Sequence, residues 1–390
     1  MKVLVGLSGG VDSAVAAYLL QQQGYEVCCA FMRNWDSMTN QDFLGNPTVN
    51  DDICPQEQDY LDAKSVADSL GLELLRVDFV KEYWDYVFTS FLAEYEKGRT
   101  PNPDILCNKY IKFASFFEFA KTRGFETVAT GHYARIIEKD GEYFLGKGKD
   151  SNKDQSYFLA QIPRTVLANT LFPLGEIEKT KVRDIANSLN LSIAMKKDST
   201  GICFIGERDF REFLKNYLPA KSGDIIDVDS NKVLGQHEGV LYYTIGQRKG
   251  LNIGGVGGPW FVVGKDVSKN ELYVAAKEDN KWLISDSCIV ENMNWLCQSP
   301  NSEFSCTAKF RYRQKDHSVT VEIVSADKVK VKYPQGIPAV TPGQEAVFYQ
   351  GDVCLGGGVI EISYHQGIDV AANIMEELYG KDNREKKSSQ

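Results

Sequence analysis

Short apolar runs alternate with segments of helical spacing over residues 1–135. Four of the runs predict strands: Val3–Leu7, Glu26–Met32, Glu73–Val77 and Thr127–Thr130. Three segments, each followed closely by a glycine, predict helices: Ser13–Gln23, Asp59–Leu70 and Lys109–Thr122. This alternation is typical of an α/β domain, in which helices cover both faces of a parallel sheet and ligands bind at the carboxyl ends of the strands.

The pattern changes beyond about residue 215, where short alternating runs are separated by Gly, Asn and Asp. Strands are predicted at Gly223–Val228, Val240–Ile245 and Trp260–Val263. Residues 283–363 read as β throughout, including a hairpin of Ser318–Val324 and Lys328–Lys332, which predicts a small barrel or sandwich. The last segments predict a helix and then a disordered polar tail: Ile368–Gly380 and Lys381–Gln390.

Composition fits a globular protein of two or three domains, since 43% of the 390 residues are hydrophobic and 25% are charged. Met1 leads directly into a predicted strand, and the sequence holds no apolar run of membrane-spanning length. The nine cysteines therefore read as reduced thiols of a cytoplasmic protein with no membrane partner. With no Cys-x-x-Cys pair and four His, no structural metal is expected.

The net charge of -9 comes from one part of the chain. Residues 1–100 hold 7 Lys and Arg against 16 Asp and Glu, whereas the remaining residues hold 37 of each kind. Basic patches that could contact nucleic acid therefore remain possible outside the first hundred residues. A second unusual stretch, the long polar segment Asn34–Pro55, predicts a surface excursion near the site.

The string from Ser8 to Ser13 (Ser-Gly-Gly-Val-Asp-Ser) lies in the first strand-to-helix turn. Its two glycines let the backbone approach a phosphate, and the following helix directs free N–H groups at the anion. Asp12 could hold a magnesium ion or orient the loop. The alternative is a plain connecting turn. A similar string at Gly141–Lys147 lacks the following Ser or Thr and looks like a strand pair, which argues against a phosphate loop there.

Two cysteines stand in unusual surroundings. Cys107 lies just before or within the first turn of the aromatic-rich helix, which Asn102 or Asp104 can cap, so the helix dipole is expected to favour its thiolate. Cys203 lies between Gly201 and Gly206, which predicts a mobile loop. The alternative for both is a small buried hydrophobe. That alternative is preferred for six others: Cys28, Cys29, Cys288, Cys297, Cys306 and Cys354. The role of Cys54 is left open.

Several motifs in this order resemble the tRNA-specific 2-thiouridylases, members of the ATP-pyrophosphatase superfamily. They are Ser8–Ser13, Asn102–Asn108 (Asn-Pro-Asp-x-x-Cys-Asn), Thr130–Tyr133 (Thr-Gly-His-Tyr), Asn152–Tyr157 (Asn-Lys-Asp-Gln-Ser-Tyr), Gly201–Gly206 (Gly-x-Cys-Phe-Ile-Gly), Thr244–Arg248 (Thr-Ile-Gly-Gln-Arg) and Phe310–Arg313 (Phe-Arg-Tyr-Arg). The resemblance runs from residue 1 to about 363. It implies an adenine nucleotide alpha hydrolase-like domain over residues 1–215 that carries both cysteines, a small central domain over 216–282, a C-terminal β-barrel over 283–365 and a tail over 366–390.

The resemblance also implies a reaction. A sulfurtransferase of this family uses ATP, with Mg2+ expected beside it, to adenylate the O2 of uridine 34 of tRNA, the wobble position. Persulfide sulfur from a protein donor then gives 2-thiouridine, AMP and pyrophosphate. The expected partners are tRNA and that donor, with no DNA.

The resemblance further implies the roles of individual residues. Cys107 is the nucleophile, Cys203 the persulfide carrier and Asp104 an acid–base candidate. ATP is expected at Gly6, Leu7, Ser8, Gly9, Gly10, Val11, Asp12, Ser13, Met32 and Gly131. The target base is expected at Asn102, Pro103 and Asp104. The rest of the tRNA is expected at His132, Lys153, Asp154, Gln155, Arg311, Tyr312 and Gln344.

Charge interleaved with an aromatic ring over Arg311–Arg313 independently suits phosphate contact and base stacking, although a solvated strand face is an equal alternative. Two other functions stay open at this stage. One is an ATP-pyrophosphatase that amidates or ligates a small molecule, which needs no cysteine pair. The other is a nucleotide-sensing RNA-binding module without chemistry, against which the two intact cysteines argue.

Overall fold

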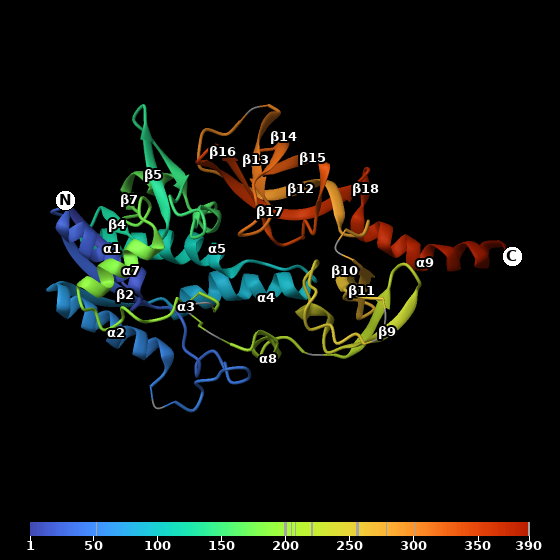
Figure 1. Cartoon of the computed structure of the whole chain (residues 1–390), viewed down its shortest axis with the longest axis horizontal. Coiled ribbons are helices and arrows are strands. Elements are labelled where there is room, and N and C mark those ends of the chain that lie inside the picture. Colours follow the sequence, from blue (N-terminus) through green and yellow to red (C-terminus); the bar gives the residue numbers. More distant parts are fainter. Residues whose placement is uncertain are drawn as a thin grey trace.

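The computed structural model describes residues 1–390 except 52, 199, 200, 204, 207, 220, 255, 256, 278, 301, 389 and 390, and it describes no side chains from 381 onward. Within the described residues, three sheets succeed one another along the chain, from the N-terminal sheet through a small central sheet to a barrel (Figure 1). The predicted α/β start and β-rich remainder are both confirmed.

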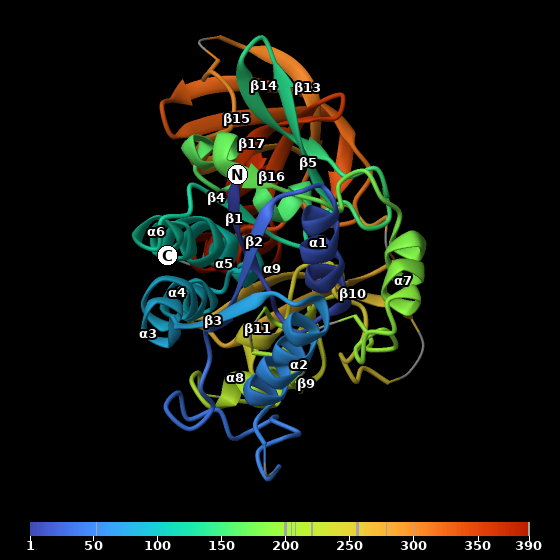
Figure 2. The same ribbon diagram turned by 90° about the vertical axis from the view of Figure 1, so that its left-hand side faces the viewer.

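The N-terminal sheet is parallel, with the order β3-β2-β1-β4-β7. Its strands are β1 (Lys2–Gly6), β2 (Glu26–Arg33), β3 (Glu73–Asp78), β4 (Thr127–Ala129) and β7 (Thr170–Leu171). Val3 and Val5 pack with helices α1 (Val11–Gln22), α2 (Pro55–Leu70) and α7 (Lys179–Ser188) on one face, whereas Leu4 faces the opposite core. Because both faces of β1 are buried, that strand is apolar from Val3 to Gly6, and Figure 2 shows its place within the sheet.

The opposite face is covered by two long helical runs. The first, which the apolar pattern did not predict, comprises α3 (Val80–Tyr83), the π-helical η1 (Trp84–Phe88) and α4 (Thr89–Glu96). The second comprises α5 (Pro103–Cys107), the π-helical η2 (Asn108–Ser115) and α6 (Phe116–Thr122). The second run begins at Pro103 rather than Lys109 because the Asn102 side chain accepts hydrogen bonds from two backbone N–H groups, which caps the helix there.

The central sheet has the order β10-β11-β8-β9. Its strands are β8 (Gly223–Asp227), β9 (Lys232–His237), β10 (Trp260–Asp266) and β11 (Glu271–Ala276). The strand expected at Val240–Ile245 is wrong, because Val240–Tyr242 forms the short 3-10 turn η5. Tyr242 is buried and its hydroxyl donates to the Leu218 carbonyl, so tertiary packing accounts for this apolar run without a β ladder.

The barrel is antiparallel and closed, because its first strand pairs with its last as well as with β15. Its strands are β12 (Ile284–Trp295), β13 (Phe304–Lys309), β14 (His317–Ser325), β15 (Lys328–Pro338), β16 (Glu345–Gln350) and β17 (Val353–His365). The predicted hairpin is β14–β15. An N-terminal hairpin, β5 (Ala134–Lys139) and β6 (Glu142–Lys147), joins this sheet by pairing β6 with β17.

The chain ends in β18 (Ile368–Asp369) and helix α9 (Val370–Ser388), which extends away from the body in Figure 1. Ile374 and Leu378 of α9 pack into the core of the central sheet. The helix expected at Ile368–Gly380 is confirmed, since α9 begins at Val370, and the disordered tail expected for Lys381–Gln390 stays a prediction. Residues 389 and 390 lie outside the described residues.

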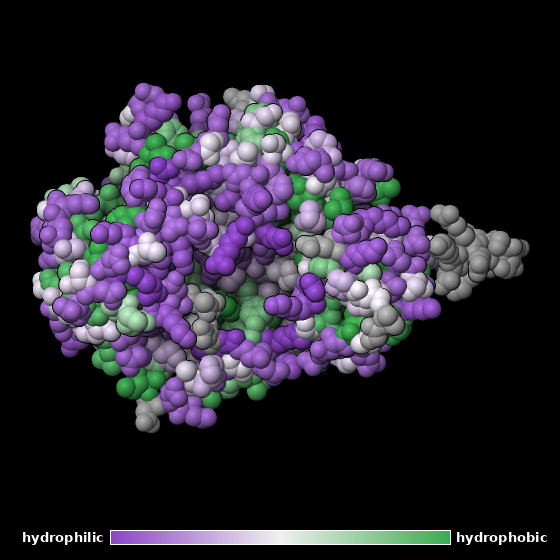
Figure 3. Space-filling view, viewed as in Figure 1, coloured by the Kyte–Doolittle hydropathy of each residue, from purple (hydrophilic) through white to green (hydrophobic). Residues whose placement is uncertain are grey.

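The remaining elements are the 3-10 turns η3 (Ser156–Leu159) and η4 (Arg164–Asn169) and helix α8 (Phe210–Lys215). The described residues of the polar segment from Asn34 to Cys54 are irregular, as expected, and buried Asp42 forms an ion pair with Arg208 beside α8. Among the described residues, no helix is both long and apolar enough to cross a membrane. Figure 3 shows a mainly hydrophilic face on which the hydrophobic patches are small and separate.

Candidate active site

The loop between β1 and α1 folds around its own hydroxyl groups. The Ser8 backbone N–H donates to Ser13 Oγ at 3.1 Å, and Ser13 Oγ donates to the Gly10 carbonyl at 3.0 Å. Gly9 has a φ of +74°, and a Cβ on it would lie 2.3 Å from the Asp59 carbonyl oxygen. Only glycine fits this left-handed position against the backbone of α2.

Two residues expected at the nucleotide lie against this loop. A Cβ on Gly131, just after β4, would lie 2.8 Å from the backbone of Asp12 and Ser13, so the end of β4 touches the start of α1. A Cβ on Gly6 would lie 3.1 Å from Met32 Cε. The structure therefore brings Gly6–Ser13, Met32 and Gly131 together at the carboxyl edge of the parallel sheet.

Cations surround the loop carboxylate, and the sequence did not point to them. Lys179 Nζ lies 2.7 and 2.8 Å from the two Asp12 carboxylate oxygens, and the Tyr133 hydroxyl donates to Asp12 Oδ1 at 2.8 Å. Lys196 Nζ donates to the Gly9 carbonyl at 3.2 Å. Positive charge at this loop suits the phosphates of a nucleotide.

Asp198 forms ion pairs with three basic side chains, one of which is Lys179. Its carboxylate contacts Lys153 at 2.8 Å, Lys179 at 2.8 Å and Arg183 at 2.7 Å. Burial alone would raise the pKa of the Asp198 carboxyl. The hydrogen bonds and charges of Lys153 and Lys179 together have the larger effect and hold this pKa well below its usual range. The negative charge of Asp198 offsets part of the repulsion between these neighbouring cations.

The two cysteines meet at the start of the second helical run. Cys107 Sγ and Cys203 Sγ lie 3.7 Å apart, close enough to share a proton. Asp104 Oδ1 accepts a hydrogen bond from the Cys203 backbone N–H at 3.1 Å, and the Tyr83 hydroxyl donates to the Cys203 carbonyl at 2.9 Å. These bonds hold a segment that the sequence predicted to be a mobile loop, although Cys203 itself is only half-buried.

The charge in this pair is not where the helix dipole predicted it. Burial raises the pKa of the Cys107 thiol well above its ordinary value. The pKa of Cys203 is lowered, first by its hydrogen bond with Cys107 and then by the Lys112 ammonium, against the effect of burial. Desolvation of Cys107 outweighs the dipole of the helix that carries it, so of the two sulfurs Cys203 is the one whose thiolate form the surroundings favour.

A cavity of about 330 Å³ opens beside the pair. Its wall includes Asn102, Pro103 and Asp104, together with Gly201 and Ile202 from the Cys203 segment. Burial raises the pKa of the Asp104 carboxyl, which makes this group a better proton carrier near neutral pH than an exposed carboxylate. The cavity is large enough for a nucleobase, and its wall includes residues adjacent in the chain to Cys203 and on the same short helix as Cys107.

The other cysteines take structural positions. Four of the six cysteines expected to be buried are buried: Cys28, Cys29, Cys288 and Cys354. The other two, Cys297 and Cys306, are only half-buried. Cys54, which the sequence left open, is exposed immediately before α2. Among the described residues, no group of three or more His, Cys, Asp or Glu side chains could hold a metal ion.

Residues expected to contact RNA divide into exposed and buried sets. Arg311 is exposed in the turn between β13 and β14, which is a turn and not the strand face considered above. The ring of its neighbour Tyr312 lies 4.3 Å from that of Phe158, whose carbonyl accepts from Asn108. Gln344 Nε2 donates to the Thr100 carbonyl at 2.7 Å, so the barrel reaches both ends of the α5 segment.

Three others are already engaged within the protein. His132 is buried, its Nδ1 lies 2.7 Å from Thr130 Oγ1, and burial lowers its pKa well below the ordinary value. Asp154 is buried and accepts from the Gly148 and Ser156 N–H groups. Gln155 Oε1 accepts from the Tyr133 N–H at 2.9 Å. These three side chains support the site from within.

Comparison with known proteins identifies the family. Models match the tRNA methyl transferase HUP domain over residues 1–207, the tRNA methyl transferase PRC-barrel domain over 211–276 and the aminomethyltransferase beta-barrel domain over 285–360. The chain is 56% identical over 368 residues to the tRNA-specific 2-thiouridylase MnmA of Mycoplasma capricolum subsp. capricolum, across 92% of this chain and 98% of that protein. The chain belongs to the tRNA-specific 2-thiouridylase family.

A second 2-thiouridylase, from Bacillus cytotoxicus, is 51% identical over 367 residues, which cover 94% of this chain and 96% of that protein. A solved 4-thiouridine synthetase–RNA complex with bound ATP matches with a TM-score of 0.31 and 15% identity, over 53% of this chain and 45% of that one.

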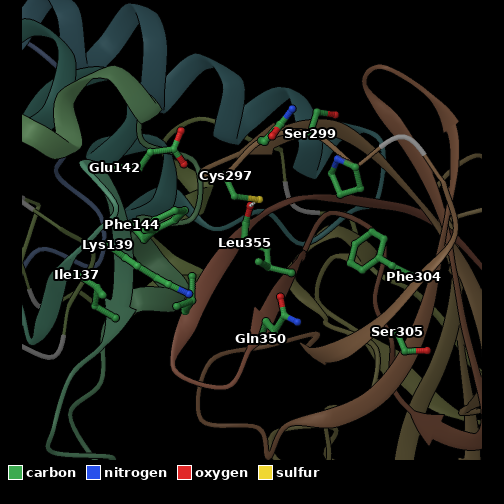
Figure 4. Close-up of a pocket in the computed structure, with 13 residues that line it drawn as sticks. Ile137, Lys139, Glu142, Phe144, Cys297, Ser299, Phe304, Ser305, Gln350 and Leu355 are labelled. Atoms are coloured by element: carbon green, nitrogen blue, oxygen red, sulfur yellow. Dashed lines mark hydrogen bonds between the residues drawn. The ribbon is translucent and has the colours of Figure 1, made fainter.

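A second cavity of this 2-thiouridylase-family chain lies elsewhere. It measures about 920 Å³ and opens between the β5–β6 hairpin and the barrel. Figure 4 shows Lys139 and Glu142 of the hairpin on one side and Cys297 and Phe304 of the barrel region on the other. None of the described residues that line it belongs to the loop Gly6–Ser13 or to the cysteine pair.

Proposed function

We propose that the chain is a tRNA-uridine 2-sulfurtransferase that thiolates the wobble uridine of tRNA at the expense of ATP. One observation carries the proposal: two cysteines 96 positions apart in the chain lie 3.7 Å from each other, beside a cavity of nucleobase size. The nucleotide-type loop on the same domain and the names of the close relatives support it.

The first step is activation of the uridine by ATP. Uridine O2 attacks the α-phosphorus of ATP, an O–P bond forms, and pyrophosphate leaves. The backbone of Gly9 and Gly10 and the ammonium groups of Lys179 and Lys196 are placed to bind its phosphates. The Asp12 carboxylate, already holding a cation, fits a magnesium ion shared with those phosphates, which would neutralise the charge of the departing group.

The second step replaces oxygen by sulfur. The Cys203 thiolate first takes a sulfane sulfur from a protein persulfide donor, a role that suits the sulfur carrying the negative charge. The terminal sulfur of this persulfide attacks C2 and AMP leaves. Cys107 then gives up its proton and attacks Cys203 Sγ, which forms a disulfide and releases 2-thiouridine. Release of hydrosulfide by Cys107 before attack on C2 is the alternative order, and it ends in the same disulfide.

The tRNA is proposed to lie across the N-terminal domain and the barrel. Asn102, Pro103 and Asp104 would hold the target base, since they line the cavity beside the cysteines. Lys153, exposed Arg311 and Tyr312, and Gln344 would contact the remainder. The proposed domains are the nucleotide-binding domain (1–215), the central domain (216–282), the barrel (283–365) and the tail (366–390). The nine free cysteines suit a reducing, cytoplasmic compartment.

A single assay separates this proposal from its alternatives. The protein is incubated with ATP, unmodified tRNA and a protein persulfide donor, and AMP and thiouridine are measured. We expect both products in equal amounts, and neither with a tRNA that carries cytidine at the wobble position. AMP formed without tRNA on a small-molecule acceptor would favour the amidating or ligating alternative, and no AMP at all would overturn the proposal.

A further inference from the structure

Lys112 is a charged side chain at the cysteine pair that the mechanism above does not use. It lies on η2, five positions after Cys107 and eight after Asp104 along the same continuous helix. In a π-helical segment, residues five positions apart lie one turn apart on the same face. The helix therefore directs Lys112, Cys107 and Asp104 toward one side, where the Cys203 segment lies against them.

The surroundings of Lys112 are almost wholly anionic or neutral. Burial opposes its charge, but the sulfurs of Cys203 and Cys107 and the Asp104 carboxyl raise the pKa of the lysine above its ordinary value. Its positive charge in turn acts to lower the pKa of Cys203, Cys107 and Asp104, so the ammonium lies close to all three groups. The neighbouring His132 is held neutral, partly by Lys112, and the Tyr83 phenol stays protonated because burial raises its pKa. Lys112 is thus the cation that the described residues place among these groups.

We propose that Lys112 is the counter-ion of the sulfur chemistry: it holds Cys203 as a thiolate for sulfur uptake and then stabilises the anionic persulfide that faces the base. Only the claim about the persulfide rests on the proposed function. The claim that Lys112 favours the Cys203 thiolate concerns the reduced protein without substrate or donor. A buried sulfur anion without a partner would be protonated, since desolvation favours the neutral thiol.

The competing role for Lys112 is purely structural, as a partner of the Asp104 carboxylate. The two roles predict different behaviour of the sulfur. If Lys112 serves Cys203, removing its charge must lower the thiolate fraction at neutral pH. If it serves only Asp104, the sulfur must titrate as before.

The test measures the pH dependence of iodoacetamide alkylation at Cys203 in the full-length protein, by peptide mass spectrometry, with no ATP, tRNA or sulfur donor present. Lys112→Met is expected to shift the midpoint upward by at least one pH unit. The rate at pH 7 then falls about tenfold or more while the rate at pH 10 is kept. Lys112→Arg should remain within about threefold of wild type, because the charge is retained.

Three controls accompany this experiment. Lys121→Met removes an exposed lysine from the same helical run and should leave the Cys203 profile unchanged. Exposed Cys54 should react equally in every variant, as an internal reference. Retained ATP binding and an unchanged melting temperature would show that Lys112→Met is folded.

An unchanged Cys203 profile in folded Lys112→Met would overturn the inference. Should that variant not fold, the wild-type protein still decides it, because a Cys203 midpoint at or above that of N-acetylcysteine would contradict a stabilised thiolate. The readout needs neither substrate nor donor. Failure to form thiouridine in the assay above would therefore refute the proposed function without touching this result.

Discussion

The nucleotide loop and the cysteine pair sit on the same domain but are built in opposite ways. The loop is one contiguous stretch, Gly6–Ser13, whose internal hydrogen bonds involve the Ser13 hydroxyl, the Ser8 N–H and the Gly10 carbonyl. Its shape depends on glycine, since no side chain fits at Gly9. The cysteine pair is assembled from distant segments and depends on the charges around its two sulfurs. A phosphate can be bound by backbone alone, whereas a sulfur anion needs particular side chains around it.

The two regions share one helical run, Pro103–Thr122. Cys107 lies near its start, and a Cβ on Gly6 of the loop would lie 3.7 Å from the ring of Phe116 nearer its end. A base in the cavity and a nucleotide on the loop would therefore meet along one rigid element. The four predictions below test whether the regions can be disabled separately.

The largest effect is expected at the sulfurs. Cys107→Ser and Cys203→Ser should each lower thiouridine formation by roughly 10³-fold or more, since neither variant can form the disulfide. Cys107→Ser should still accept sulfur at Cys203, whereas Cys203→Ser should accept none from a protein donor. Mass spectrometry of the intact variants after exposure to the donor measures this.

Both variants should bind ATP normally, because the loop is independent of the sulfurs. Cys54→Ser, at an exposed position, serves as the matched control and should keep full activity. Persulfide on Cys107 in an active Cys203→Ser protein would reverse the two roles.

The next effect concerns the loop carboxylate. Asp12→Ala should lower AMP formation by about 10²-fold, because it removes the group that holds Lys179 and that fits magnesium, without changing core volume. Cys203 alkylation should stay as in wild type. Asp184→Ala, on the exposed side of α7, is the control. AMP release within about threefold of wild type, a change below 1 kcal/mol, would remove Asp12 from the site.

A smaller effect is expected on stability where the barrel meets the cysteine helix. Glu345 at the start of β16 is buried, its Oε2 lacks a hydrogen-bond partner, and burial raises its pKa to about 8. The folded state therefore binds this proton more tightly than the unfolded chain. The wild-type free energy of unfolding should fall as pH rises from about 4.5 to about 8 and should level off above that range.

Glu345→Gln keeps the shape and stays neutral, so its advantage over wild type should grow across that window to about 1–3 kcal/mol at pH 8. Urea unfolding at pH 5 and pH 8 measures the difference. Glu138→Gln, on an exposed part of β5, controls for the chemical change. An equal difference at both pH values would show that Glu345 does not titrate there.

The smallest effect is expected in the salt dependence of tRNA binding. Arg311→Ala with Arg313→Ala should flatten the slope of log affinity against log salt by about two units at most, because each phosphate contact releases about one counterion. The equivalent change at exposed Lys232 of the central sheet should not alter the slope. Salt-independent binding by the wild type would exclude phosphate recognition by this turn.

The sequence predicted most of what depends on local pattern. Apolar strands and helices ended by glycine gave β1, α1, β2 and β3 to within about two residues, whereas α2 begins at Pro55 and not at the predicted Asp59. The run Val80–Glu96 was missed because its Trp, Tyr and Phe side chains bury into a shared core and leave no clean polar face. Val240–Tyr242 was misjudged because an apolar run looks the same whether it pairs with a strand or packs as a turn.

The candidate site divides along the same line. Loop residues Ser8–Ser13 form a motif that can be read directly, and the cysteines stand out through their flanking residues. Lys112 and Lys179 gave no signal, since a single lysine in a helix usually faces solvent. Their importance appears only when the fold places them beside Cys203 and Asp12. The error about Cys107 has the same origin, because sequence shows the helix dipole but not the desolvation that outweighs it.

The pairing of β6 with β17 has a consequence for how this chain can be divided. Backbone hydrogen bonds join Gly146 and Leu145, from the first half of the sequence, to Val353 and Cys354 near its end. A protein cut before the barrel would leave β6 as an open edge, whose unpaired N–H and C=O groups invite self-association. The order of folding is constrained as well, since a ribosome must deliver nearly the whole polypeptide before its early hairpin can find a partner.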